Sequence, residues 1–241
     1  MPRWRPIIAS RLATWASLND DERVRLERLV AWFVADQRWE AAQGFELNEE
    51  IKVTIAAHAA LLILELDEDC YHNVSSIIVH PSTIVMDRER AGPAPGLAAS
   101  GPEYLLGEAW FEGPVLIAWD AALDAARHPE RGHNVVFHEF AHRLDMLDGL
   151  SDGTPPLATR EELERWVEVC TAEFRALTEG PDPLIDGYGA TNPAEFFAVV
   201  TEVFFDRGAD LLAAKPDLYE VLRGFYRQDP AARRRRAAGP A

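Results

Sequence analysis

The chain has 241 residues, of which 48% are hydrophobic and 27% charged, values typical of a folded protein with a core of ordinary size. Its formal net charge of −16 argues against the basic surface that nucleic-acid phosphates and anionic lipids require. We therefore expect neither a nucleic acid nor a membrane as a partner.

The first residues and the cysteines indicate where the protein resides. Arg11 interrupts the apolar run that begins at Ile7, so this run is too short for a signal peptide. No stretch approaches the roughly 20 apolar residues that a membrane span needs. Cys70 and Cys170 are far apart in the sequence, and we interpret them as reduced and buried. We expect a cytoplasmic protein.

Two helices are predicted in the N-terminal part. The acidic sequence from Asn19 to Glu22 is typical of a helix start, and this helix is expected to continue to about Trp39. A second helix is predicted over residues 48–64, and its apolar middle indicates that it lies in the core. His58 lies in that middle part and is interpreted as a core histidine.

The central part contains β-branched runs and a loop. Three short runs predict the strands of a small sheet: residues 76–79, 83–86 and 115–119. Residues 89–107 are rich in glycine and proline and are expected to form a surface loop. Asp120 is a candidate cap for a short helix that ends before Pro129.

The C-terminal part is predicted to be helical. Helices are expected over about 133–146, from Thr159, from Pro193 and over about 209–226. The arginines at 233–236 are interpreted as a solvated charge run. The whole pattern predicts a mainly helical α+β protein with a small mixed sheet.

The helix predicted over 133–146 carries an HExxH motif, His138-Glu139-Phe140-Ala141-His142. Residues i and i+4 lie on one face of a helix, about 6 Å apart along its axis, so both imidazoles can bind one zinc ion. Glu139 lies one step round the helix, where it could take a proton from a zinc-activated water as general base. Random order would produce the motif in roughly one of fifty such chains, so a third ligand is needed to support it.

Three acidic residues compete for the position of third ligand. Glu195 fits, but the preceding Asn192 and proline also fit a helix cap in which Glu195 has only a local role. Glu202 lies seven residues further on, on nearly the same helix face. Asp145 is three residues after His142, and we prefer it as a partner that orients an imidazole.

Two further side chains are candidates for the site. Tyr188 lies in a Gly-Tyr-Gly turn, seven residues before Glu195. A phenol beside a zinc ion can donate a hydrogen bond to a developing oxyanion, although an ordinary loop tyrosine is the alternative. His133 points elsewhere on the predicted helix and is treated as peripheral.

Two blocks of sequence resemble the MtfA family of zinc peptidases. Residues 134–145 are similar to the HEFAHxLD block of that family, and residues 188–197 are similar to its second block. The segments 107–115 and 44–66 are similar as well, and the resemblance extends over residues 18–230. The two blocks together are specific, whereas HExxH alone is not.

The resemblance implies a set of site residues. The zinc ligands would be His138, His142 and Glu195, with one Zn²⁺ in each chain. Glu139 would be catalytic, and Tyr188 would be the active-site tyrosine.

The resemblance also implies a fold and an activity. One zincin-like domain is expected over residues 1–241, similar to the catalytic domain of anthrax lethal factor. It would comprise an N-terminal helical part over 18–70, a catalytic part over 71–230 and a basic tail over 231–241. Hydrolysis of peptide substrates is expected, by an aminopeptidase rather than an endopeptidase. Because the family is named after binding of the glucose repressor Mlc, sequestration of a transcriptional repressor is the alternative function.

Overall fold

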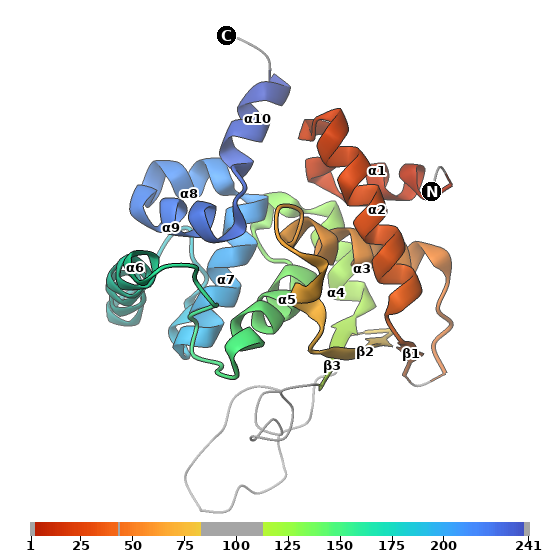
Figure 1. Cartoon of the computed structure of the whole chain (residues 1–241), viewed down its shortest axis with the longest axis horizontal. Helices are drawn as coiled ribbons and strands as arrows, with labels where there is room; N and C mark the ends of the chain where they lie inside the picture. The colour runs from red at the N-terminus through yellow and green to blue at the C-terminus, as the bar shows by residue number, and fades with distance from the viewer. Residues whose placement is uncertain (1–2, 43, 83–112, 239–241) are drawn as a thin grey trace, which may run out of the picture.

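The computed structural model describes residues 3–42, 44–82 and 113–238, which contain ten α-helices and three strands (Figure 1). The first elements are α1 (Arg5–Arg11), η1 (Ala13–Ser17), α2 (Asp20–Asp36), β1 (Trp39–Ala41), α3 (Glu49–Leu62), η2 (Glu68–Tyr71) and β2 (Val74–His80). They are followed by β3 (Gly113–Ala118), α4 (Trp119–Arg127), η4 (Pro129–Arg131), α5 (Val135–Asp145), η5 (Met146–Asp148) and α6 (Arg160–Glu179). The chain continues through η6 (Gly187–Ala190), α7 (Pro193–Asp206), α8 (Gly208–Ala214), α9 (Pro216–Tyr226) and α10 (Pro230–Ala238).

Helix α2 begins as its sequence predicts and ends earlier. The side chain of Asn19 accepts a hydrogen bond from the backbone N–H of Glu22, and the Glu22 carboxylate accepts one from the N–H of Asn19. This capping box satisfies two N–H groups that the helix leaves without intrahelical partners. The helix ends at Asp36, because Trp39 is the first residue of β1, a strand that the sequence did not predict.

Helix α3 is buried along nearly its whole length, which agrees with its apolar sequence. His58 is 3% exposed and its Nδ1 lies 2.9 Å from the carbonyl oxygen of Thr54. Burial lowers the pKa of His58 to about 4, because the charged imidazolium would lose its hydration. The interpretation of His58 as a core histidine is therefore confirmed.

The three strands form one parallel sheet in the order β1-β2-β3. Ile77 of β2 lies opposite Trp39 on one side and Val115 on the other. The mainly helical α+β class is confirmed, but over the described residues the sheet is parallel where a mixed sheet was expected. The predicted strand at 83–86 and the predicted loop at 89–107 lie outside the described residues.

One continuous cluster of buried apolar side chains extends from Ile8 to Ala231. Phe140 of α5 lies inside it, with its ring centroid 5.4 Å from that of Phe33 and 5.0 Å from that of Tyr71. These edge-to-face contacts bury one face of α5 and therefore fix which of its faces is left for the histidines. The division into a single domain with the expected parts remains a prediction.

The helix predicted over about 209–226 is two helices, α8 and α9, which meet at Lys215 and Pro216. A proline disfavours helical geometry in the residue before it, and Lys215 has φ −139° and ψ 68°. Its ammonium group lies 2.6 Å from a carboxylate oxygen of Glu173 and 2.9 Å from one of Asp182. The break therefore places a cation where α6 and the following loop each provide a carboxylate.

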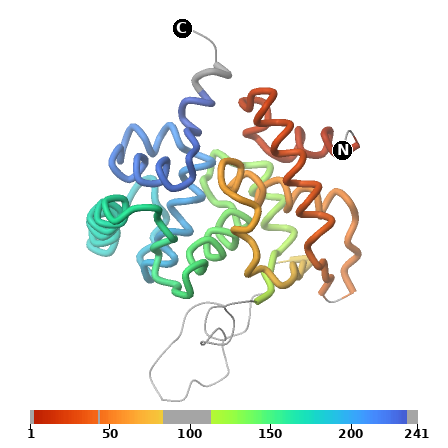
Figure 2. The backbone as a smooth tube through the Cα atoms, in the orientation of Figure 1, coloured from red at the N-terminus to blue at the C-terminus, as the bar shows by residue number. Residues whose placement is uncertain are grey.

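The first arginine of the tail has a structural role that was not predicted. Arg233 of α10 is only 3% exposed, and it donates hydrogen bonds to Glu22 at 2.9 Å and to Gln228 at 2.8 Å. Gln228 in turn donates to the carbonyl oxygen of Leu61 at 2.8 Å. Figure 2 shows α10 and the N-terminal helices at the same end of the molecule. The interpretation of residues 233–236 as a solvated run is therefore wrong for Arg233.

In the part of the chain that the structure describes, no helix has both the length and the apolar character of a membrane span. The cysteines in this part, Cys70 and Cys170, are both free thiols, but each is half-buried where full burial was expected.

Candidate metal centre

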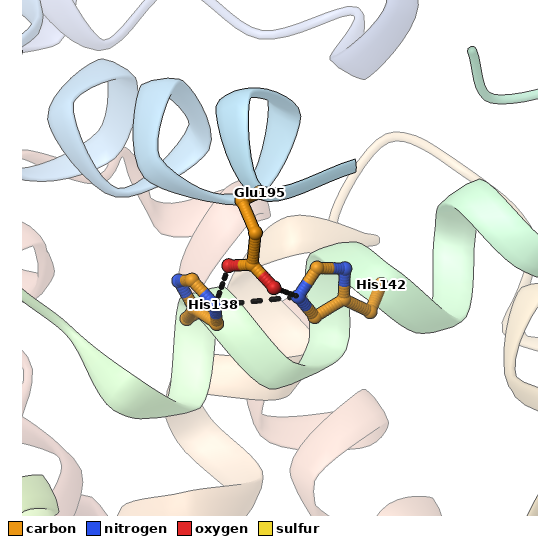
Figure 3. Close-up of side chains that lie close together, drawn as sticks. All are labelled: His138, His142 and Glu195. Carbon is orange, nitrogen blue, oxygen red and sulfur yellow. Dashed lines mark hydrogen bonds and ion pairs between the residues drawn. The ribbon is translucent and has the colours of Figure 1, made fainter. Parts of the chain in front are cut away.

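Helices α5 and α7 pack against each other and bring three potential metal ligands together (Figure 3). His138 and His142 come from α5, and Glu195 comes from the first turn of α7. Their candidate ligand atoms all lie within 4.8 Å of one another. Within the described residues, no other group of three such side chains meets that distance.

Each of the two helices starts with an asparagine cap. Asn134 accepts a hydrogen bond from the N–H of Phe137 at 3.2 Å, and Asn192 accepts one from the N–H of Glu195 at 2.9 Å. Pro193 occupies the first position of α7, as predicted. The cap uses the backbone of Glu195, whereas its carboxylate points toward the histidines (Figure 3). The capping and ligand interpretations of Glu195 are therefore compatible.

The atoms that face one another fit a cation. Nε2 of His138 lies 2.9 Å from Oε2 of Glu195 and 3.2 Å from Nε2 of His142, which is 3.5 Å from Oε1 of Glu195. On its other side, Nδ1 of His138 lies 2.8 Å from Oε1 of Glu202, a carboxylate that can only accept. A neutral His138 therefore carries its proton on Nδ1 and directs the lone pair of Nε2 at another acceptor. Two nitrogens and one carboxylate oxygen are a donor set that zinc binds.

The electrostatics of His138 lead to the same conclusion. Burial disfavours the charged imidazolium, but only this charged form donates hydrogen bonds from both ring nitrogens, to Glu195 and to Glu202, and these bonds outweigh burial and raise the pKa of His138 to about 10. Positive charge is thus stabilised at this point of the structure, and the residues present fit a bound metal cation.

The other two candidate ligands lie outside the cluster. Glu202 contacts the far side of His138, and a carboxylate oxygen of Asp145 accepts a hydrogen bond from the N–H of Gly153 at 3.0 Å. Asp145 is fully buried, which raises its pKa to about 6. Nδ1 of His142 is buried and has no hydrogen-bond partner within the described part of the chain. The structure therefore does not show Asp145 orienting an imidazole.

Gly153 holds the loop after α5 against the start of α7, a role that the sequence analysis missed. Its φ is +78°, its N–H donates to Asp145, and its carbonyl oxygen accepts a hydrogen bond from Trp166 Nε1 at 3.1 Å. A Cβ atom on this residue would lie 2.2 Å from the carbonyl oxygen of Pro193, two residues before Glu195. The Asp-Gly pair at 152–153 signals a turn, but the sequence does not show what the turn packs against.

Glu139 lies beside the cluster on α5 and is half-buried. One helical turn on, Arg143 is 7% exposed and donates a hydrogen bond to the carbonyl oxygen of Pro114 at 2.8 Å, which joins α5 to β3. Burial lowers the pKa of Arg143, and the charge of Glu139 opposes that shift. Sequence reasoning missed Arg143; its spacing of four residues from Glu139 was the available signal.

Tyr188 lies at the edge of the cluster. Its backbone N–H donates to Asp186 at 2.7 Å, its ring centroid is 6.0 Å from that of His138, and it is 40% exposed. His133 lies outside the cluster, with its Nε2 3.8 Å from a carboxylate oxygen of Asp186. The structure therefore brings together His138, His142 and Glu195, with Glu139 and Tyr188 adjacent.

The chain matches the family described as glucose-regulated metallo-peptidase M90 over residues 1–227. It is 36% identical over 234 residues to an uncharacterized protein from Synechocystis sp., covering 95% of this chain and 85% of that protein. It is 32% identical to Mlc titration factor A from Serratia proteamaculans over 244 residues (98% and 90% coverage) and to Mlc titration factor A from Yersinia pestis over 229 residues (92% and 83%). These matches confirm the resemblance, and the chain belongs to the M90 family of metallopeptidases.

Proposed function

We propose that this protein is a zinc-dependent peptidase whose metal is held by His138, His142 and Glu195. The observation that carries the proposal is the convergence of these three side chains, within 4.8 Å, in a member of a metallopeptidase family. Zinc bound there supplies Lewis acidity, because it polarises the scissile carbonyl and makes water acidic enough to lose a proton near neutral pH.

Glu139 is the proposed general base. It directly follows His138 on α5, it is half-buried, and its charge favours the protonated form of His138. From that position it takes a proton from the attacking water and later gives it to the leaving amine. The guanidinium of Arg143 and the carboxylate of Glu139 attract each other. The hydrogen bond from Arg143 to the carbonyl oxygen of Pro114 holds the guanidinium in place.

Tyr188 is the proposed hydrogen-bond donor to the substrate. Its exposed ring has its centroid 6.0 Å from that of His138. We propose that its phenol O–H donates a hydrogen bond to the oxygen of the scissile carbonyl. That bond strengthens as negative charge develops on the oxygen, so it stabilises the transition state more than the bound substrate.

Aminopeptidase action is the finer part of the proposal, and it rests on the resemblance to the MtfA family. We propose peptides with a free N-terminus as the substrates. The test is hydrolysis of matched fluorogenic peptides with free and with acetylated N-termini by the zinc-loaded protein. Cleavage of the acetylated series at equal rate would replace the aminopeptidase proposal with endopeptidase action.

The Glu139→Gln variant tests the mechanism. It keeps the size of the side chain and removes the base, so activity should fall by about 10²–10⁴-fold at unchanged zinc content. Glu161→Gln, which changes an exposed glutamate on α6, is the matched control and should keep wild-type activity. Wild-type activity in Glu139→Gln would refute the assigned base.

A second candidate function is binding of a transcriptional repressor of the Mlc type. It is favoured by the relatives at 32% identity that carry the name Mlc titration factor A. Calorimetric titration of a purified Mlc-type repressor with the wild type and with Glu139→Gln tests it. Equal affinity for both would establish partner binding independent of hydrolysis, and no heat with either would remove this candidate. The cytoplasmic location remains a prediction.

A further inference from the structure

Two N–H donors converge on one buried carboxylate behind the cluster of candidate metal ligands. Oε1 of Glu202 lies 2.8 Å from Nδ1 of His138, and its Oε2 accepts a hydrogen bond from the backbone N–H of Asn134. Each oxygen of Glu202 therefore has one donor, and the side chain is buried, with Glu202 only 5% exposed. Asn134 is the cap of α5, so its N–H has no acceptor within that helix.

We propose that Glu202 is a positioning residue, whose carboxylate holds His138 in the one tautomer and ring orientation that presents Nε2 to the metal. The inference rests on the proposed role of His138 as a metal ligand, and it adds the residue that prepares this ligand. Glu202 lies on the same face of α7 as Glu195, but it contacts Nδ1 of His138 while Glu195 faces Nε2, so the two acids have different roles.

A carboxylate is required at this position, because both of its neighbours are donors. Glutamine has the same shape but offers one acceptor and one donor group. If its NH₂ faced His138, Nδ1 would have to accept and the ring proton would move to Nε2, the atom that faces Glu195. If its NH₂ faced Asn134 instead, a buried backbone N–H would lose its acceptor at the start of α5.

The contact with Asn134 links the orientation of His138 to the start of its helix. His138 lies one turn after Asn134, and its own N–H donates to the Asn134 carbonyl oxygen at 2.9 Å. Glu202 therefore holds the first turn of α5 at both ends, through the backbone of Asn134 and through the imidazole of His138. Partners of this kind typically affect metal affinity by about 10–100-fold.

Asp206 provides a matched control, because it lies one turn after Glu202 on the same helix. Its Oδ2 is 3.4 Å from the side-chain amide nitrogen of Asn134, whereas Glu202 contacts the backbone N–H of Asn134. Asp206→Asn removes a carboxylate from the same helix and the same asparagine while leaving the contact between Glu202 and His138 intact.

The experiment measures zinc affinity by chelator competition in the wild type and in Glu202→Gln, Glu202→Asp, Asp206→Asn and Glu195→Ala. We expect Glu202→Gln to bind zinc about 10–100-fold more weakly, with Asp206→Asn close to the wild type. Glu202→Asp keeps two acceptor oxygens and should recover part of the loss. Long-range ¹H–¹⁵N spectra of the zinc-loaded proteins should show a slowly exchanging Nδ1 proton on His138 in the wild type, and this proton should exchange faster in Glu202→Gln, because its carboxylate acceptor is gone.

The outcomes separate this inference from the function on which it rests. Wild-type zinc affinity in Glu202→Gln, or a larger loss in Glu202→Asp than in Glu202→Gln, would overturn the role of Glu202 alone. Equal zinc affinity in the wild type and in Glu195→Ala would overturn the metal centre itself, and the role of Glu202 with it. If Glu202→Gln does not fold, the comparison of Glu202→Asp with Asp206→Asn decides: Glu202→Asp must be the weaker binder.

Discussion

Replacing Gly153 with alanine tests whether the loop after α5 sets the position of the metal ligand on α7. The added Cβ would lie 2.2 Å from the carbonyl oxygen of Pro193, far inside the 3.0 Å below which such contacts are essentially never found. The position of the Cβ is fixed by its own backbone, and the carbonyl group of Pro193 is itself backbone, so neither can rotate away. Relief therefore requires the loop or the first turn of α7 to move, and Glu195 is in that turn.

The expected cost has two parts. The φ of +78° costs a non-glycine residue about 1–2 kcal/mol, and the overpacking adds about 1–3 kcal/mol. Gly153→Ala should therefore lower the free energy of unfolding by about 2–5 kcal/mol, with roughly 2–4 °C of Tm lost for each kcal/mol in a chain of this size. Zinc affinity should fall as well, because movement of α7 separates Glu195 from the two histidines.

Gly44→Ala is the control, because Gly44 has φ +72° and no atom within 4 Å of an added Cβ. It isolates the conformational cost from the contact, and it should leave zinc affinity unchanged. The assay is urea unfolding of both variants together with chelator competition for zinc. If both variants lose the same stability and both keep wild-type zinc affinity, the contact with Pro193 does not constrain the site.

Three further predictions concern the proposed hydrogen-bond donor Tyr188, the buried arginine Arg233 of α10 and the core histidine His58. Tyr188→Phe should keep full zinc content and lower kcat by about 10²–10³-fold, measured by peptide hydrolysis and metal analysis; unchanged kcat would remove the tyrosine from the mechanism. Arg233→Met leaves the carboxylate of Glu22 without this ion pair and should lower the free energy of unfolding by about 3 kcal/mol, whereas Arg234→Met, at an exposed position, should change it little. The pKa of His58 is about 4 in the folded protein and has its ordinary value of 6.5 in the unfolded chain, so the unfolded chain binds its proton first on acidification. The contribution of His58 to the free energy of unfolding is fully present above pH 6.5. It is lost as the pH falls toward 4, which lowers the free energy of unfolding by about 3 kcal/mol. Unfolding curves between pH 7 and pH 4 should show a weaker acid dependence in His58→Phe, and an identical dependence would contradict the assignment.

Local sequence rules determined the parts of the site that lie on a single helix. The separation of four residues between His138 and His142 places both imidazoles on one face, because helical geometry repeats every 3.6 residues. The caps at Asn19, Asn134 and Asn192 follow from the same kind of short-range chemistry. The family resemblance then pointed to Glu195, to which no local rule could give preference over Glu202.

Only the tertiary structure decided between acids on the same helix. Glu195 and Glu202 have similar positions around the axis of α7, but α5 crosses so that the first faces Nε2 of His138 and the second faces Nδ1. The register of one helix against another depends on core packing, here the burial of Phe140 on the far face of α5. That packing arises from residues throughout the sequence, so a pattern of spacing cannot reveal it.

The same distinction between local contacts and contacts between distant segments explains which of the other predictions from the sequence were right and which were wrong. Sequence periodicity was sufficient to predict the buried helix α3 and its core histidine, because a helix that is apolar on nearly all sides must lie in the core. The strand β1, the close contact of Gly153 with Pro193 and the burial of Arg233 all depend on partners distant in sequence, up to 211 residues away for Arg233 and Glu22. The sequence alone thus determined which chemical groups are available, because helix spacing and capping are local. Their roles were decided by the fold, because contacts between distant segments form only when the whole core packs.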